Sequence, residues 1–223
     1  MSEPSIYLQN GDDLARRFLA FANTLRPVDV ENGYFCQIVI ELLDASLTNY
    51  RQLRQGYVDD NYPLLAWACR NLLELTIFLK YVLISEANAR RFGDDRLIDG
   101  VEIFTALRDL ELHYDPTTTT LPLDDAIAQM RAQMAAENVT ESGHLSVGRL
   151  VDQVGMGQEF RTMNRVSSKL VHPTAWSILA VNPETNSFPD AKGIMFLSGV
   201  GYMAGMLIAS REHNDAHGMR PNP

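Results

Sequence analysis

Hydrophobic residues recur every three or four positions over almost the whole chain, with polar residues between them. This spacing places them on one face of an α-helix, and no segment shows the strict alternation of a β-strand. Helices are predicted over residues 12–25, 34–53, 62–85, 86–114, 123–137, 146–154, 157–172 and 193–210, and loops over 115–122, 138–143 and 181–193. We expect an all-α, single-domain bundle of seven to nine helices over residues 1–223, with flexible ends at 1–11 and 212–223.

Glycine and proline residues set several of these expected boundaries. Gly56 follows basic residues near the end of the second helix, which is a common arrangement at a helix C-terminus. One of residues 59–61 is expected to cap the third helix, with Pro63 in its first turn. One or two helices are expected over residues 86–114, with Gly93 and Gly100 as the expected breaks.

The third predicted helix is hydrophobic on most faces but carries polar side chains among them, namely Arg70, Asn71, Glu74 and Lys80. Charges in such a helix are unfavourable unless they are paired. Arg70 and Glu74 are four residues apart, so they share a face and can pair; Asn71 lies beside them and Tyr81 lies further along the same side. Two interpretations follow. The pair fixes the helix in place, or it forms the wall of a binding pocket in which Arg70 binds an anion.

The helix at 157–172 has a separate polar face. Arg161, Arg165, Ser168 and His172 recur at intervals of four, three and four residues. Pro173 disfavours helical geometry at His172 and is expected to end the helix there. The face is interpreted either as a solvated or capping surface, or as a charged cluster that binds phosphate or carboxylate. In the second case His172 would act as acid or base and titrate near neutrality.

Other combinations of chemically active residues are weak. Glu111, His113 and Asp115 alternate with a period of two, which on a helix would scatter their side chains around it. His213 and His217 have a metal-ligand spacing but lie in a polar tail. No glycine-rich phosphate loop or dinucleotide fingerprint is present. We therefore predict no metal and no cofactor.

Composition narrows the class of protein. Of 223 residues, 46% are hydrophobic, enough for a sizeable core. The formal net charge of -9 weighs against RNA or DNA as a partner, because phosphate contacts need a basic surface. Cys36 and Cys69 lie in hydrophobic helical patterns and are expected to be free thiols. The first residues do not resemble a signal peptide, so we expect a cytoplasmic protein.

The uncharged segment 193–210 is barely long enough to cross a bilayer. Gly201 and Gly205 form a spacing that often permits close helix packing, while glycine and serine lower the hydropathy of the segment. We expect a core helix packed closely at its small residues, and no membrane association.

The two polar segments resemble an uncharacterised family of bacterial all-helical domains. Its pattern is an Arg-x-x-x-Glu helix followed by a helix ending in Ser-x-x-x-His-Pro. Arg70 and Glu74 match the first part, and Ser168, His172 and Pro173 match the second. Thr174 stands where the family has serine. The resemblance implies that these residues form one site or one structural lock, and it implies no known activity.

A looser resemblance is to HEPN-type helical ribonucleases, whose motif is an arginine followed within two helical turns by a histidine. Arg165 and His172 fit this spacing, although Val166 stands where the family usually has a polar residue. The resemblance implies a metal-independent ribonuclease with Arg165 and His172 as catalytic residues, in a bundle that often dimerises.

These observations leave three hypotheses. The first is a soluble binding or regulatory protein whose Arg/Glu/Ser/His cluster is a structural lock or a small-anion site. The alternative is the HEPN-like ribonuclease, and the third is a membrane-associated protein that uses its last helix. Whether the protein is an enzyme stays open. A small anionic ligand and a second copy of the chain are the expected partners, and RNA is less favoured because of the acidic charge.

Overall fold

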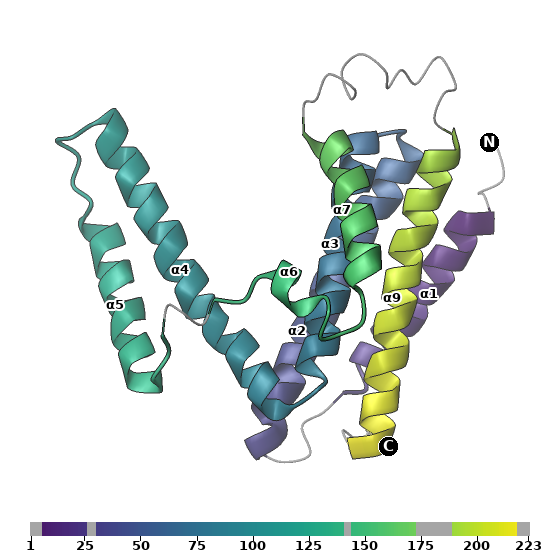
Figure 1. Cartoon of the computed structure of the whole chain (residues 1–223), viewed down its shortest axis with the longest axis horizontal. Helices are drawn as coiled ribbons and strands as arrows, with labels where there is room; N and C mark the ends of the chain where they lie inside the picture. Colours follow the sequence, from purple (N-terminus) through teal and green to yellow (C-terminus); the bar gives the residue numbers. More distant parts are fainter. Residues whose placement is uncertain (1–5, 26–29, 141–143, 173–188, 218–223) are drawn as a thin grey trace. The chain divides into compact units, whose positions relative to one another are not determined.

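The computed structural model describes residues 6–25, 30–140, 144–172 and 189–217 (Figure 1). Regular structure in this part of the chain consists of eight helices, without a strand. The all-α class and the expected number of helices are confirmed. Pro173, Thr174 and most of the expected loop at 181–193 lie outside the described residues.

The single all-α domain is divided by its contacts into two compact units, Met1–Ser85 with Val147–Pro223, and Glu86–Ser146. The helices of the first unit are α1 (Ile6–Ala22), α2 (Val30–Val58), α3 (Tyr62–Val82), α6 (Val147–Leu150), α7 (Gly157–Val171) and α9 (Pro189–His217). The second unit contains α4 (Glu86–Tyr114) and α5 (Leu121–Glu137), which pack against each other.

Helix α3 is the central element of the first unit. It packs against α2, α6, α7 and α9 (Figure 1). Its hydrophobic character on most faces explains this position, because Leu65, Leu72 and Ile77 are all fully buried. The Oδ1 atom of Asn61 accepts a hydrogen bond from the Leu64 N–H at 3.1 Å, so Asn61 caps the helix as one of the three expected candidates.

The expected helix end at Gly56 and the expected breaks at Gly93 and Gly100 were wrong, whereas the alternative of one helix over residues 86–114 is confirmed. Helix α2 continues through Gly56, where an added Cβ would lie 2.6 Å from the backbone nitrogen of Leu65. Helix α4 is continuous through Gly93 and Gly100, and a Cβ on Gly100 would lie 2.6 Å from Met130 Sδ in α5. Gly56 and Gly100 therefore permit close approach to a neighbouring helix rather than ending their own.

Some helices extend beyond the predicted limits. Helix α1 begins at Ile6, so part of the expected flexible end is helical, and α9 runs from Pro189 to His217 rather than 193–210. Helix α6 ends at Leu150, earlier than expected. The extra turn of α1 contains Gly11, which is buried and would bring a Cβ within 2.6 Å of Tyr50 Oη. The absence of a side chain at Gly11 therefore allows α1 to pack closely against α2, which the hydrophobic pattern of the sequence does not indicate.

Helix α9 packs against α1, α2 and α3. Its segment Ala191–Ala216 is long and hydrophobic enough to cross a membrane, with a mean hydropathy of 1.6, and 44% of that window is buried. Close packing occurs at Gly199, where a Cβ would lie 2.6 Å from Leu53. The expected close contact at Gly201 and Gly205 was wrong, because a Cβ on either would meet no described atom within 4 Å. That the chain does not associate with membranes stays a prediction.

Candidate functional site

Arg70 and Glu74 of α3 form the predicted ion pair. Arg70 Nε lies 2.8 Å from Glu74 Oε1, and the two side chains are 32% and 25% exposed. Asn71 Nδ2 donates to Asn49 Oδ1 of α2 at 3.0 Å, and Tyr81 is buried. Because Arg70, Glu74 and Asn71 find their partners within α3 or on α2, they resemble a structural lock more than the wall of a binding pocket.

The predicted polar face of α7 is exposed to solvent. Arg161, Arg165 and His172 are exposed, while Ser168 is partly buried and its hydroxyl donates to the Arg165 carbonyl at 3.3 Å. Arg161 Nη2 donates to Gln158 Oε1 at 3.4 Å. His172 is the C-cap, with extended backbone geometry and an N–H that donates to the Ser168 carbonyl. The helix thus ends where the sequence predicts.

The two predicted clusters lie on packed neighbours, since α3 contacts α7. The interactions of Arg70, Glu74 and Asn71 nevertheless lie within α3 or between α2 and α3, and those of Arg161 and Ser168 lie within α7. None of these five residues lines the cavities described next. The geometry therefore gives no support to a single shared pocket.

A cavity of about 680 Å³ lies between α1 and α2. Tyr50 Oη donates to Asp12 Oδ1 at 2.8 Å, and Arg54 Nε lies 3.0 Å from the same oxygen. Burial raises the pKa of the Tyr50 hydroxyl, and the hydrogen bond to Asp12 and the Asp12 charge raise it further. Leu19 and Leu47 add hydrophobic lining, and Arg51 stands one turn before Arg54.

This cavity is not evident from the sequence, because its parts come from two helices far apart along the chain. In the sequence, Arg51 and Arg54 are the basic residues near the end of the second predicted helix, and Asp12 borders an expected flexible segment. The spacing of the two arginines, which puts both on one face of α2, was the one local signal available.

A smaller cavity of about 280 Å³ lies among α3, α7 and α9. Lys80, Glu159 and Tyr202 line it, and the missing side chains of Gly201 and Gly205 leave it open. Burial raises the pKa of Tyr202, with the charges of Cys69 and Glu159 and a hydrogen bond to Glu159 adding to the effect. Its polar groups are thus partly paired with one another.

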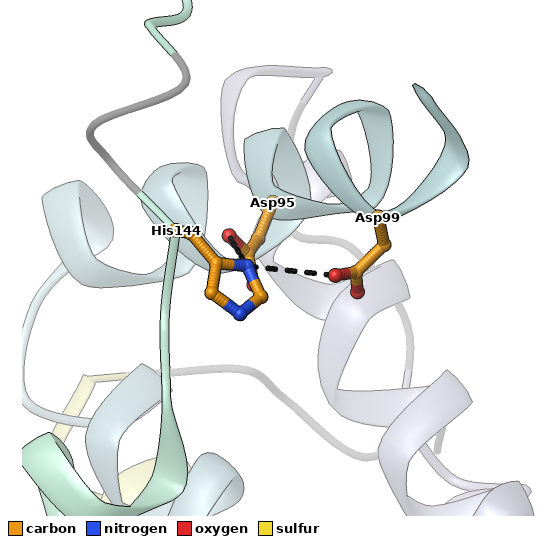
Figure 2. Close-up of side chains that lie close together, drawn as sticks. All are labelled: Asp95, Asp99 and His144. Atoms are coloured by element: carbon orange, nitrogen blue, oxygen red, sulfur yellow. Dashed lines mark ion pairs between the residues drawn. The ribbon is translucent and has the colours of Figure 1, made fainter. Parts of the chain in front are cut away.

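A third cluster lies wholly within the second unit. Figure 2 shows Asp95 and Asp99 of α4 facing His144, which comes from the segment after α5. His144 Nδ1 lies 3.3 Å from Asp95 Oδ1 and 3.5 Å from Asp99 Oδ1. Burial and the neighbouring Asp95 charge raise the pKa of Asp99, and His144 opposes this shift.

The sequence predicts no metal site, and these three residues form no recognisable motif in it. Asp95 and Asp99 are four residues apart, a spacing that places two carboxylates on one helical face. His144 follows Gly143 in a segment predicted to be loop, so nothing local connects it with α4. These three side chains, one ligand atom from each, could hold a metal ion.

Comparison with known proteins finds no matching family model, no similar curated protein and no similar solved structure. The resemblances to a bacterial all-helical family and to HEPN ribonucleases thus stay predictions. Function must be inferred from the cavities and side-chain clusters themselves.

Proposed function

We propose that the protein is a non-enzymatic binding protein of the cytoplasm that holds a small organic anion in the cavity between α1 and α2. The observation that carries this proposal is the pair Arg51 and Arg54, one helical turn apart on the wall of a cavity of about 680 Å³. That volume falls in the range of ordinary small-molecule sites, which combine hydrophobic lining with a few polar groups.

The charges around the cavity leave cationic donors available. Arg54 contacts Asp12 through Nε, so its terminal amino groups are not used by that carboxylate. Arg51 has no ion pair among the described residues, whereas Asp13 pairs with Arg16. The partner of Asp12 is Arg54 and that of Asp13 is Arg16, which leaves Arg51 and the terminal amino groups of Arg54 to bind a carboxylate or phosphate.

The rest of the lining supports binding rather than covalent chemistry. Leu19 and Leu47 would contact a hydrophobic part of the ligand. No histidine, cysteine or serine lines the cavity within the described ranges, and the raised pKa of Tyr50 makes its hydroxyl a poor nucleophile. The expected small anionic ligand is thus retained, but its site moves from Arg70, which lines neither cavity, to α2.

Calorimetric titration with phenyl phosphate tests the proposal, with neutral benzyl alcohol as the ligand control. Arg51→Ala and Arg54→Ala should each weaken phenyl phosphate binding by roughly tenfold or more, the effect of losing a charge-assisted hydrogen bond. Arg17→Ala, an exposed change on α1 outside the lining, should leave affinity unchanged. Absence of saturable binding, or equal losses in all three variants, would overturn the proposal.

The alternative proposal is a HEPN-like, metal-independent ribonuclease. The observation that favours it is the exposure of both Arg165 and His172 on α7, where a large substrate can reach them. RNA cleavage in the presence of EDTA should then disappear in Arg165→Ala and His172→Ala but persist in Arg149→Ala, an exposed arginine of α6. Cleavage that survives in the first two variants, or is absent from the wild type, would rule this out.

A further inference from the structure

The cluster of Asp95, Asp99 and His144 is separate from both functions proposed above, because it lies in the second unit. Two carboxylates and one imidazole converge from two segments of the chain, with their ligand atoms all within 4.8 Å of one another (Figure 2). Carboxylate oxygens and imidazole nitrogens are the ligands that zinc and related divalent metals take in proteins when cysteine is absent.

The two distances from His144 Nδ1 match the spacing of ligands around a metal ion, and they also lie within ion-pair range. In a tetrahedral site with ligand distances near 2.1 Å, two ligand atoms are separated by about 3.4 Å. The observed separations from His144 Nδ1 are 3.3 Å to Asp95 Oδ1 and 3.5 Å to Asp99 Oδ1. A cation between the three groups would thus reach the nitrogen and both carboxylates with little movement.

The hydrogen bonding of His144 points the same way. Its Nδ1 atom is buried and makes no hydrogen bond, although two carboxylate oxygens are within ion-pair distance. A tetrahedral metal on this nitrogen would place each neighbouring oxygen about 35° from the lone-pair axis, too far off for a straight hydrogen bond. Nδ1 therefore faces two carboxylates without a hydrogen bond to either of them.

The site is also held in place by the fold. The side chain of Asp95 is 10% exposed, and its Oδ1 accepts a hydrogen bond from the Leu145 N–H at 2.9 Å. This hydrogen bond holds Leu145, the residue after His144, against Asp95 of α4, so the imidazole and the carboxylate are positioned together. Hydrogen bonds that orient a ligand in this way are typical of metal sites. Asp99 is 52% exposed and can adjust its position.

We propose that Asp95, Asp99 and His144 bind a divalent transition-metal ion of the zinc class, with a water molecule completing a four-coordinate site. Two carboxylates and a neutral imidazole carry a charge of minus two, which the metal would neutralise, whereas a protonated His144 alone would neutralise half of it. Bound metal would tie the segment after α5 to α4 and stabilise the second unit.

The test uses the full-length, tag-free chain titrated with Co²⁺ and Zn²⁺. Tetrahedral Co²⁺ has visible absorption bands, so it reports geometry as well as binding. The wild type should bind one Co²⁺ with such bands, and Zn²⁺ should displace it. Asp99→Asn and His144→Ala should lower Zn²⁺ affinity at least about tenfold and remove the bands. The matched changes Asp125→Asn and His113→Ala, at exposed positions of the same unit, should do neither.

Two further outcomes decide the proposal. Zn²⁺ should raise the Tm of the wild type but not that of Asp99→Asn. The Asp99 side chain is exposed, so this variant should still fold, and circular dichroism can verify its helicity. Absence of stoichiometric metal binding in the wild type would overturn the site. Undiminished binding in both Asp99→Asn and His144→Ala would place the metal elsewhere, for example on the histidines of the C-terminal segment, and would overturn it equally.

Discussion

The Leu145 N–H donates a hydrogen bond to Asp95 Oδ1 at 2.9 Å, joining the segment after α5 to the middle of α4. Both residues are buried, so the bond is shielded from water. Removing the carboxylate would leave the Leu145 N–H without a partner in a buried position, and an unsatisfied buried donor is strongly unfavourable.

Asp95→Ala should therefore lower the free energy of unfolding by about 1–3 kcal/mol in metal-free protein. Asp95→Asn keeps an oxygen that can accept the hydrogen bond and should lose much less. Urea denaturation of the two variants with EDTA present measures the difference. Equal losses would show that the charge of Asp95, and not its hydrogen bond to Leu145, supports the second unit.

Two glycines should respond to alanine in opposite directions. Gly56→Ala would put a Cβ 2.6 Å from the Leu65 backbone nitrogen and should destabilise the protein by about 1–3 kcal/mol. Gly201→Ala adds a Cβ that meets no described atom within 4 Å, and should stabilise α9 by up to about 1 kcal/mol through higher helix propensity. Thermal unfolding of both variants is the measurement. Similar shifts for the two would contradict the packing at Gly56.

The contrast between these glycines shows how far sequence can predict this fold. Helices, the Asn61 cap and the Arg70–Glu74 pair depend on residues within about one turn, and periodicity and spacing predicted each of them. The role of Gly56 depends on how closely α2 approaches the start of α3, which no local pattern records. Its sequence context equally suits a helix end.

The candidate sites were harder to predict for the same reason. Asp12 meets Arg54, and Asp95 meets His144, only because separate segments pack together. Within each segment these side chains look like ordinary surface polar residues. The α7 face was predictable as a solvated helical face, yet its exposure alone assigns no ligand.

Cys69 should make stability fall at high pH. Burial raises the pKa of its thiol to about 12 from an ordinary 9.0, partly offset by a hydrogen bond from the Gly199 backbone. Between these two pKa values the thiol loses its proton in the unfolded chain but keeps it in the folded chain. The contribution of Cys69 to the free energy of unfolding is therefore intact below pH 9 and declines as pH rises above it. The decline approaches about 1.4 kcal/mol per pH unit.

Urea denaturation at pH 8 and pH 10 measures this effect, with Cys69→Ala as the matched control. The wild type should lose more stability than the variant over this interval, because the variant lacks the thiol while other alkaline titrations persist in both. A thiol-specific reagent at pH 8 should also label the native protein slowly and the denatured protein rapidly, since Cys36 and Cys69 are both buried. Equal pH dependence in wild type and variant would contradict the raised pKa.

The hydroxyl of Tyr50 should support the α1–α2 cavity through Asp12. Tyr50→Phe keeps the buried ring but removes the 2.8 Å hydrogen bond to Asp12 Oδ1, leaving Arg54 as the main partner of that carboxylate. Arg54 would then be held more strongly by Asp12 and be less available to an anion. We expect a loss of about 1 kcal/mol in stability and a several-fold weaker affinity for phenyl phosphate.

Asp12→Asn should act oppositely on affinity, because it releases Arg54 while keeping an oxygen for the tyrosine. Calorimetric titration of both variants gives the comparison, and a change of the same sign in both would mean that Asp12 does not restrain Arg54.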